Sequence, residues 1–138
     1  MIITRGVVHF TIPVTDPDRS REFYCQRLGM RLLANVPALG MVFLDSGGSC
    51  VVLARVAKPI STAGVREVHH AFLVAHDEYA AAVAELRACG VPIYYEEDRR
   101  DGVIEGPRAY FQDPDGNTLE IIDLTSYAGS IDTIEPTS

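Results

Sequence analysis

The 138-residue sequence lacks several features that would assign it to a broad functional class. Basic residues are outnumbered by acidic ones, 12 to 19, which gives a formal net charge of −7. No basic block is available to bind nucleic-acid phosphates. No stretch approaches the ~18–20 uninterrupted apolar residues of a membrane-spanning helix. We therefore expect neither a nucleic acid nor a membrane as the partner.

The sequence also has few cysteines and no visible secretion signal. Cys25, Cys50 and Cys89 are odd in number and far apart, and none belongs to a Cys-x-x-Cys pair. This pattern favours reduced thiols over a disulfide framework or a zinc ribbon. Residues 1–6 show no long apolar run and no cleavage pattern. We expect a cytoplasmic protein of one domain, since the length is about that of one.

The order of predicted elements occurs twice along the chain. In the first half, the capping pair Asp16-Pro17 predicts a helix over 18–28 that ends at Gly29. The strands predicted around it cover 7–14, 30–36, 41–45 and 50–56. The second half repeats this order with a helix over 78–89. Its predicted strands cover 68–74, 93–96, 108–112 and 118–124.

Equivalent residues of the two halves are separated by nearly constant offsets. His9 matches His69 at an offset of 60. The matches at an offset of 68 are Phe43 with Phe111, Asp45 with Asp113 and Gly48 with Gly116. Two βαβββ units are the simplest account. We expect an α+β fold in which two paired βαβββ modules form one curved sheet around a concave site.

The predicted boundaries follow from this repeat. Module 1 covers about 5–57, a linker 58–66 and module 2 about 67–125, with a flexible C-terminal tail over 126–138. Within module 2, the charged run 96–101 is predicted to be an exposed loop. The whole chain would be a single domain.

Three side chains on the predicted strands have the chemistry of metal ligands. Alternation along a strand places His9 and His69 at equivalent inward positions of the two modules. Glu120 lies in an otherwise apolar strand, where an ionised carboxylate needs a partner. Two imidazoles and one carboxylate are a common ligand set for a divalent metal. A hydrogen-bonded core histidine and a surface glutamate remain the alternatives at this point.

The segment Tyr110–Glu120, Tyr-Phe-Gln-Asp-Pro-Asp-Gly-Asn-Thr-Leu-Glu, carries a family resemblance. Together with the segments that begin at His9 and His69, it resembles the vicinal oxygen chelate superfamily. This superfamily includes glyoxalase I, fosfomycin-resistance proteins, extradiol dioxygenases and methylmalonyl-CoA epimerase. The resemblance implies paired modules around a metal-binding cavity, with His9, His69 and Glu120 as the ligands. His69 is preferred over His70 because it keeps the repeat offset.

One departure from the family pattern narrows the chemistry. The repeat places Val52 where glyoxalase I has a fourth, glutamate ligand and where the epimerase has its catalytic glutamate. Three protein ligands leave open positions on the metal. Such a site suits non-heme Fe²⁺, which we favour, or a Lewis-acidic Mn²⁺, Zn²⁺ or Ni²⁺.

Two further departures concern individual branches. The fosfomycin-resistance proteins have a serine-rich loop that binds a monovalent cation, and here the corresponding residues 104–108 read Ile-Glu-Gly-Pro-Arg. The extradiol pattern Tyr-x-x-Asp-Pro-x-Gly-x-x-x-Glu is met by Tyr110–Glu120. The second histidine of that branch is missing, because no histidine lies between His76 and Tyr110.

These considerations assign roles to the remaining candidates. Tyr110 is the predicted catalytic hydrogen-bond donor or acid/base beside the metal. The predicted substrate-binding residues are Thr11, Arg108, Met41 and Phe43. The leading hypothesis is an extradiol-dioxygenase-like enzyme for a small substrate that chelates one divalent metal ion through vicinal oxygens.

Two alternatives remain open. One is a Lewis-acid enzyme, a glyoxalase-like isomerase or a fosfomycin-type thiol transferase. The other is a metal-free binding protein of the bleomycin-resistance type, against which the three ligand residues count. By family expectation the protein would be a homodimer.

Overall fold

The computed structural model describes residues 1–62 and 65–127 of the chain. The described residues divide into two compact units. Unit 1 holds residues 1–62 and 113–117, and unit 2 holds residues 65–112 and 118–127. No helix of the described residues is long and apolar enough to cross a membrane.

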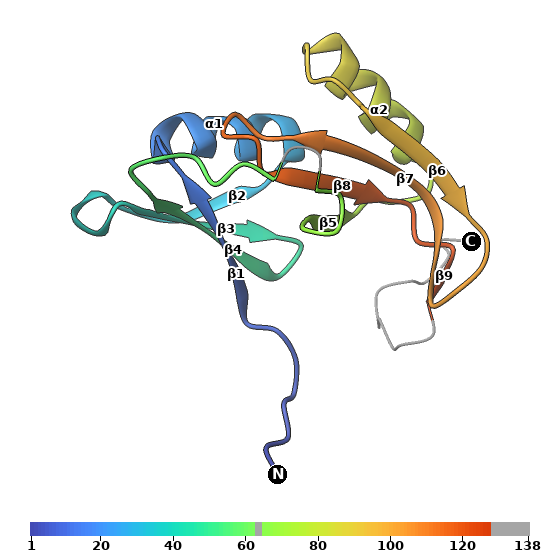
Figure 1. Ribbon diagram of the computed structural model, residues 1–138, viewed down its shortest axis with the longest axis horizontal. Coiled ribbons are helices and arrows are strands. Elements are labelled where there is room, and N and C mark those ends of the chain that lie inside the picture. The colour runs from blue at the N-terminus through green and yellow to red at the C-terminus, as the bar shows by residue number, and fades with distance from the viewer. Residues whose placement is uncertain (63–64, 128–138) are drawn as a thin grey trace. The chain divides into compact units, whose positions relative to one another are not determined.

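Unit 1 is a four-stranded sheet with one α-helix (Figure 1). Its elements are β1 (His9–Val14), α1 (Pro17–Leu28), β2 (Arg31–Val36), the 3-10 helix η1 (Pro37–Leu39), β3 (Met41–Ser46) and β4 (Ser49–Arg55). The strand order is β1-β4-β3-β2, with β1 parallel to β4 and the other pairs antiparallel. This is the βαβββ arrangement predicted for the first half.

Helix α1 confirms the capping signals of the sequence. The Asp16 side chain accepts hydrogen bonds from the backbone N–H groups of Asp18 and Arg19, and Pro17 occupies the first turn. Gly29 ends the helix with a φ of 64°. On the inner face, Tyr24 is fully buried against the sheet.

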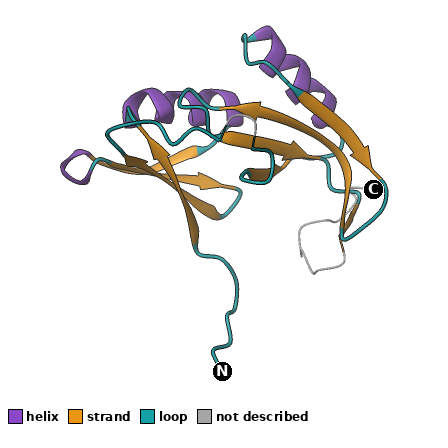
Figure 2. Cartoon of the chain, in the orientation of Figure 1, coloured by secondary structure: helices purple, strands orange, loops and turns teal. Residues whose placement is uncertain are grey.

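Unit 2 repeats the same arrangement with an added short strand. Its elements are β5 (His70–Leu73), α2 (Tyr79–Ala88), β6 (Tyr95–Arg99), β7 (Ile104–Gln112), β8 (Thr118–Ile122) and β9 (Ser126–Tyr127). The order is β5-β8-β7-β6, and β9 pairs with β7 (Figure 2). The first two residues of the predicted tail thus form β9, and the rest of it lies outside the described residues.

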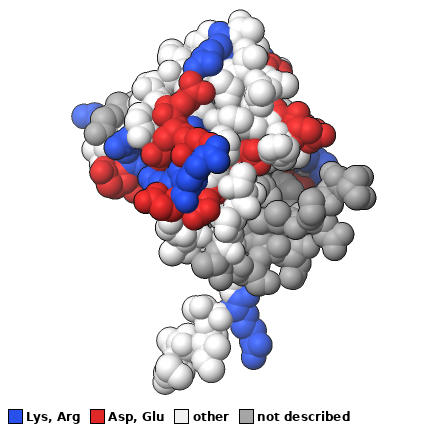
Figure 3. Space-filling model, turned by 90° about the vertical axis from the view of Figure 1, so that its right-hand side faces the viewer, with Lys and Arg blue, Asp and Glu red and all other residues white. Residues whose placement is uncertain are grey.

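Strand β6 corrects the prediction that the charged run 96–101 is a loop. Residues 96–99 pair with β7, for example Glu96 with Ala109. β6 is an edge strand of its sheet, and both of its faces carry charged side chains. The sequence therefore shows no alternation of apolar and polar residues that would predict a strand here. Figure 3 shows charges of both signs gathered on the side of the molecule where β6 runs. The ion pairs there are Arg87–Glu96, Arg99–Glu97 and Arg100–Asp98.

The strand registers define which residues of the two units correspond. In unit 1, Thr11 pairs with Val52, which pairs with Phe43. In unit 2, Ala71 pairs with Glu120, which pairs with Tyr110. These rows confirm the offset of 60 between β1 and β5 and the offset of 68 between β4 and β8.

The same registers correct two predicted matches, and in the first of them Asp45 corresponds to Gln112 and not to Asp113. Phe43 corresponds to Tyr110 and not to Phe111, so the offset between β3 and β7 is 67. The cause is the turn length, since β3 and β4 are joined by two residues whereas β7 and β8 are joined by the five residues Asp113–Asn117.

This five-residue turn belongs to unit 1, although β7 and β8 belong to unit 2. The Asp113 carboxylate accepts hydrogen bonds from the Tyr24 hydroxyl at 2.8 Å and from the backbone N–H of Asn117 at 2.9 Å. The Asp115 carboxylate accepts from the Thr15 hydroxyl at 2.6 Å and backbone N–H at 3.1 Å. The acidic residues of the Asp-Pro-Asp-Gly-Asn segment are therefore structural hydrogen-bond acceptors within unit 1.

Candidate metal centre

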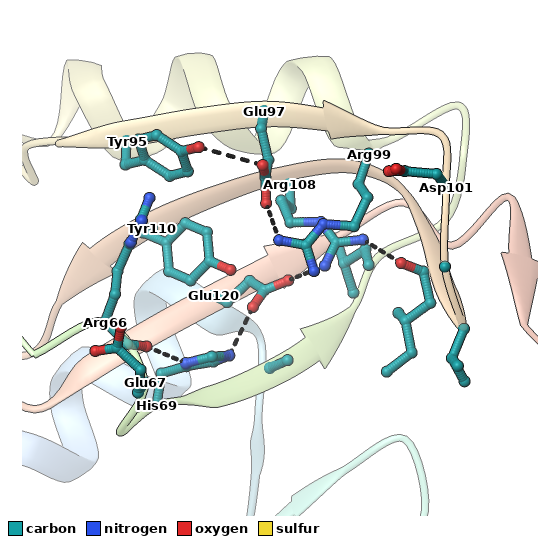
Figure 4. Close-up of a pocket in the computed structure, with 15 residues that line it drawn as sticks. Arg66, Glu67, His69, Tyr95, Glu97, Arg99, Asp101, Arg108, Tyr110 and Glu120 are labelled. Carbon is teal, nitrogen blue, oxygen red and sulfur yellow. Dashed lines mark hydrogen bonds and ion pairs between the residues drawn. The ribbon is translucent and has the colours of Figure 1, made fainter.

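Unit 2 contains an open cavity of about 570 Å³ above one face of its sheet. Side chains of β6, β7 and β8 form its walls, together with the segment that leads into β5 (Figure 4). The lining residues that matter for its chemistry are His69, Tyr95, Arg108, Tyr110 and Glu120. Arg108, Tyr110 and Glu120 alternate with core residues along β7 and β8, so these strands direct the three side chains to one side of the sheet.

Glu120 lies at the centre of this group. It is on β8, its side chain is only 3% exposed, and each of its oxygens has a basic partner. Oε2 is 2.9 Å from Nε2 of His69, and Oε1 is 3.6 Å from Nη1 of Arg108. A buried carboxylate without such partners would be very unfavourable.

The His69 ring is oriented by the backbone. Its Nδ1 contacts the carbonyl oxygen of Arg66, which only accepts hydrogen bonds, so Nδ1 carries the proton. In a neutral imidazole, Nε2 is then an acceptor, and it faces the carboxylate oxygen of Glu120. Two acceptors at 2.9 Å need a proton or a cation that both of them bind. Donation from the other ring nitrogen to a carbonyl is also typical of metal-ligating histidines. The donor set therefore fits part of a divalent-metal site.

The other predicted ligand, His9, lies in unit 1. It is the first residue of β1, and its side chain is exposed. The structure thus brings together two of the three predicted ligands, His69 and Glu120. Among residues 1–62 and 65–127, no three His, Cys, Asp or Glu side chains form a group that holds a metal.

The predicted substrate-binding residues divide between the units in the same way. Thr11, Met41 and Phe43 lie in unit 1, with Thr11 exposed and the two others half-buried. In the sheet of unit 1 they lie on one face, in register with Val52 and its neighbours on β4. Arg108 lies in unit 2 and lines the cavity.

Tyr110 lines the cavity and lies directly across the ladder from Glu120. Burial raises the pKa of Tyr110 to about 12, and the neighbouring Glu120 carboxylate acts in the same direction. The ring also meets His69 edge-on, at a centroid distance of 5.3 Å. Tyr110 is therefore a neutral hydrogen-bond donor at physiological pH.

Three cavity residues were missed by the sequence analysis. Arg66 supplies the carbonyl for His69, and its guanidinium lies 4.1 Å from the centre of the Tyr95 ring. The Tyr95 hydroxyl donates to Glu97 at 3.2 Å. Tyr95 and Glu97 are alternate residues of β6, so the period of two could have revealed them had β6 been recognised as a strand.

Comparisons with known proteins agree with this fold. A curated relative, the glutathione transferase FosA of Serratia marcescens, is 26% identical over 113 residues, which is 82% of this chain and 77% of the relative. FosX, a fosfomycin resistance protein of Listeria monocytogenes, superposes with a TM-score of 0.74 at 20% identity, covering 94% of this chain and 97% of FosX.

Another similar structure is an integron cassette protein from the metagenome of the Halifax Harbour sewage outfall. Its TM-score is 0.74 at 24% identity, with coverage of 88% of this chain and all of that protein. The model of the glyoxalase/bleomycin resistance protein/dioxygenase superfamily matches residues 6–121. The match confirms the resemblance found in the sequence, and the chain belongs to this superfamily.

Proposed function

We propose that this protein is a divalent-metal-dependent enzyme that uses Lewis-acid chemistry on a small, oxygen-bearing substrate. The reaction class is addition of a thiol or of water to the substrate. The proposed metal ligands are His69 and Glu120 from the cavity, with His9 as the third ligand implied by the family resemblance. Tyr110 is the proposed catalytic hydrogen-bond donor.

The observation that carries this proposal is the contact between His69 and Glu120. Nε2 of His69 lies 2.9 Å from Oε2 of Glu120, and the contact between Nδ1 and the Arg66 carbonyl turns Nε2 toward the carboxylate. A divalent cation satisfies both groups. When bound, such an ion polarises a substrate oxygen and stabilises negative charge on it.

The residues of the cavity then have defined tasks. Tyr110 donates a hydrogen bond to a substrate oxygen at the side of Glu120, and its high pKa keeps the proton in place. The aliphatic side chains of Ala71, Ile104 and Ile122 line other parts of the cavity and accommodate the carbon skeleton of a small molecule. Thr11, Met41 and Phe43 of unit 1 remain proposed substrate contacts.

Two relatives favour addition chemistry. FosA, at 26% identity, is a glutathione transferase. One FosX structure, with a TM-score of 0.71 at 20% identity, contains Mn(II) and 1S,2S-dihydroxypropylphosphonic acid. That molecule carries two vicinal oxygens, which is the substrate feature predicted from the sequence. Mn²⁺ is therefore the first ion to test on this chain.

The experiment combines metal analysis with two activity assays. Protein purified without chelators is analysed for bound metal, and the apoprotein is then loaded with Mn²⁺ and assayed for glutathione or water addition to a panel of small epoxides. The Glu120→Gln variant is expected to lose this activity, and the Glu96→Gln variant, altered on the outer face of β6, is expected to keep it. Equal activity in Glu120→Gln and wild type contradicts the proposal.

A second candidate function is extradiol-type ring cleavage with Fe²⁺. The spacing from Tyr110 to Glu120 favours it, because this segment meets the pattern of that branch. Against it, His69 is the only histidine among the described residues that line the cavity, so a separate histidine base is lacking there. Oxygen uptake with a catechol panel after anaerobic Fe²⁺ loading would establish this function in place of addition.

A metal-free binding protein is the third outcome. It requires that the purified protein bind no divalent metal and that His9→Ala and Glu120→Ala variants bind ligand as wild type does. We also propose a homodimer from membership of the superfamily, with light scattering as its measurement.

A further inference from the structure

We propose that Arg108 is a positioning residue that fixes the Glu120 carboxylate toward His69. The sequence alone suggested that Arg108 orients substrate, whereas its contacts in unit 2 point at the protein itself. This inference rests on the proposed function, in which Glu120 binds the metal ion.

Arg108 is held by the backbone of its own strand. Its side chain is 5% exposed. Nη2 donates to the carbonyl oxygen of Ile104 at 2.8 Å, and Nε donates to that of Gly106 at 3.2 Å. These two bonds set the plane of the guanidinium independently of any ligand. The third nitrogen, Nη1, is then the one that faces Glu120.

The two carbonyls owe their position to a close backbone approach at Gly106. A Cβ at this position would lie 1.9 Å from the carbonyl oxygen of Asp123, and the φ of 132° is itself open mainly to glycine. On either side, the Asp123 N–H bonds the Pro107 carbonyl and the Thr125 N–H bonds the Glu105 carbonyl. The carbonyls of Ile104 and Gly106 each accept a hydrogen bond from Arg108.

The consequence for Glu120 is a division of its two oxygens. Oε1 faces Arg108, and Oε2 faces Nε2 of His69, so the carboxylate has one preferred orientation. The charges of Arg108 and Glu120 also compensate each other, because either group alone would be a buried charge without a partner of opposite sign.

Unit 1 provides an internal control for this assignment. By register, Met41 occupies the position of Arg108, because Met41 pairs with Ala54 as Arg108 pairs with Ile122. Val52 occupies the position of Glu120. Where the carboxylate is absent the arginine is absent as well. A substrate-binding arginine would not need to vary together with this carboxylate.

The test uses three substitutions of Arg108 that differ in the charge and length of the side chain. Arg108→Met and Arg108→Gln remove the positive charge beside Glu120, whereas Arg108→Lys keeps the charge on a slightly shorter side chain. Arg100→Gln is the matched control, because Arg100 is exposed and pairs with Asp98. The dissociation constant for Mn²⁺ is measured by calorimetry, and crystal structures of the metal-free wild type and variants are compared. Thermal unfolding checks each fold, and the Gln variant replaces Met if Met does not fold.

We expect Arg108→Met and Arg108→Gln to weaken Mn²⁺ binding by about 10- to 100-fold and Arg108→Lys to keep it within about fivefold of wild type. We also expect the Glu120–His69 contact to be lost in Arg108→Met and Arg108→Gln. Unchanged or tighter Mn²⁺ binding in both, with the contact intact, overturns the proposal. If wild type binds no Mn²⁺, the proposed function fails, and the metal-free crystal structures still decide whether Arg108 positions Glu120.

Discussion

Units 1 and 2 share strand order and register but differ on one face of their sheets. In unit 1 the row across the centre is Thr11, Val52 and Phe43, and in unit 2 it is Ala71, Glu120 and Tyr110. The same topology thus presents a row without an ionisable side chain in unit 1 and a row with two ionisable side chains, Glu120 and Tyr110, in unit 2. The fold repeats, but the chemistry does not.

The difference shows what a buried carboxylate requires. Glu120 is accompanied by His69 and Arg108, each within 4 Å. Val52 is 5% exposed and has Met41 at the position that corresponds to Arg108. Unit 1 has no arginine at the register position of Arg108 that would compensate a carboxylate at the position of Val52.

The first prediction concerns a carboxylate introduced into unit 1, at the position that corresponds to Glu120. Val52→Glu is expected to destabilise the protein by about 4 kcal/mol, since it buries a carboxylate without compensation. Val52→Ile, which changes only volume, is expected to cost less than about 1.5 kcal/mol. Urea unfolding measures both, and a cost below 1 kcal/mol for Val52→Glu would show that the row of unit 1 already tolerates charge.

The second prediction concerns Gly106 of unit 2, whose carbonyl accepts a hydrogen bond from Arg108. Gly106→Ala is expected to cost about 3 kcal/mol, because its Cβ would overlap the Asp123 carbonyl as well as strain φ. Gly102→Ala, with a φ of 113° but nothing within 4 Å, is the control and should cost about 1 kcal/mol. Similar costs for the two variants would mean that the close approach is not a constraint.

The third prediction compares the turns of the two hairpins. Asp113→Ala removes acceptors from the Tyr24 hydroxyl and from backbone N–H groups, and we expect a loss of about 2–3 kcal/mol. The β3–β4 turn has no such buried acceptor: the Asp45 carboxylate accepts from the Gly48 N–H in an exposed position. Asp45→Ala should therefore cost less than about 1 kcal/mol in the same unfolding experiment. Equal losses of stability in Asp113→Ala and Asp45→Ala would contradict the claim that only the β7–β8 turn depends on a buried acceptor.

The smallest effect is expected from pH acting on the same turn. Although burial opposes it, hydrogen bonds from Thr15 and the Arg19 charge lower the pKa of Asp115 below its ordinary value. A lowered pKa in the folded state means that its stabilisation is complete above about pH 4 and is lost as the pH falls through the folded-state value.

Asp115→Asn is expected to flatten the acid side of the stability profile relative to wild type. Urea midpoints between pH 2 and 7 give this comparison. An acid limb as steep in Asp115→Asn as in wild type would assign the acid sensitivity to other carboxyl groups.

The parts of the fold that the sequence predicted are those with local signals. Asp16-Pro17 and Gly29 delimit α1 because capping acts over a few residues. The repeat and the family resemblance named both His69 and Glu120, and the two side chains lie 2.9 Å apart although β5 begins only at His70.

The parts that could not be predicted depend on the backbone rather than on residue types. Strand β6 is charged on both faces, so its sequence shows no alternation of apolar and polar residues, although it pairs with β7. The roles of Arg66 and Arg108 depend on main-chain carbonyls. Every residue has a carbonyl, so residue types do not indicate which carbonyls lie in the cavity. The register of β3 against β7 depends on the length of a turn that packs in the other unit.

The most direct test of the central claim is a calorimetric titration of the chelator-treated protein with Mn²⁺. Wild type is expected to bind one ion per chain, and His69→Gln and Glu120→Gln to bind it at least about 100-fold more weakly. The control is His76→Gln, because His76 forms a similar contact with Asp123 at 2.7 Å in the same unit but is exposed. Unchanged Mn²⁺ affinity in both His69→Gln and Glu120→Gln would contradict the account.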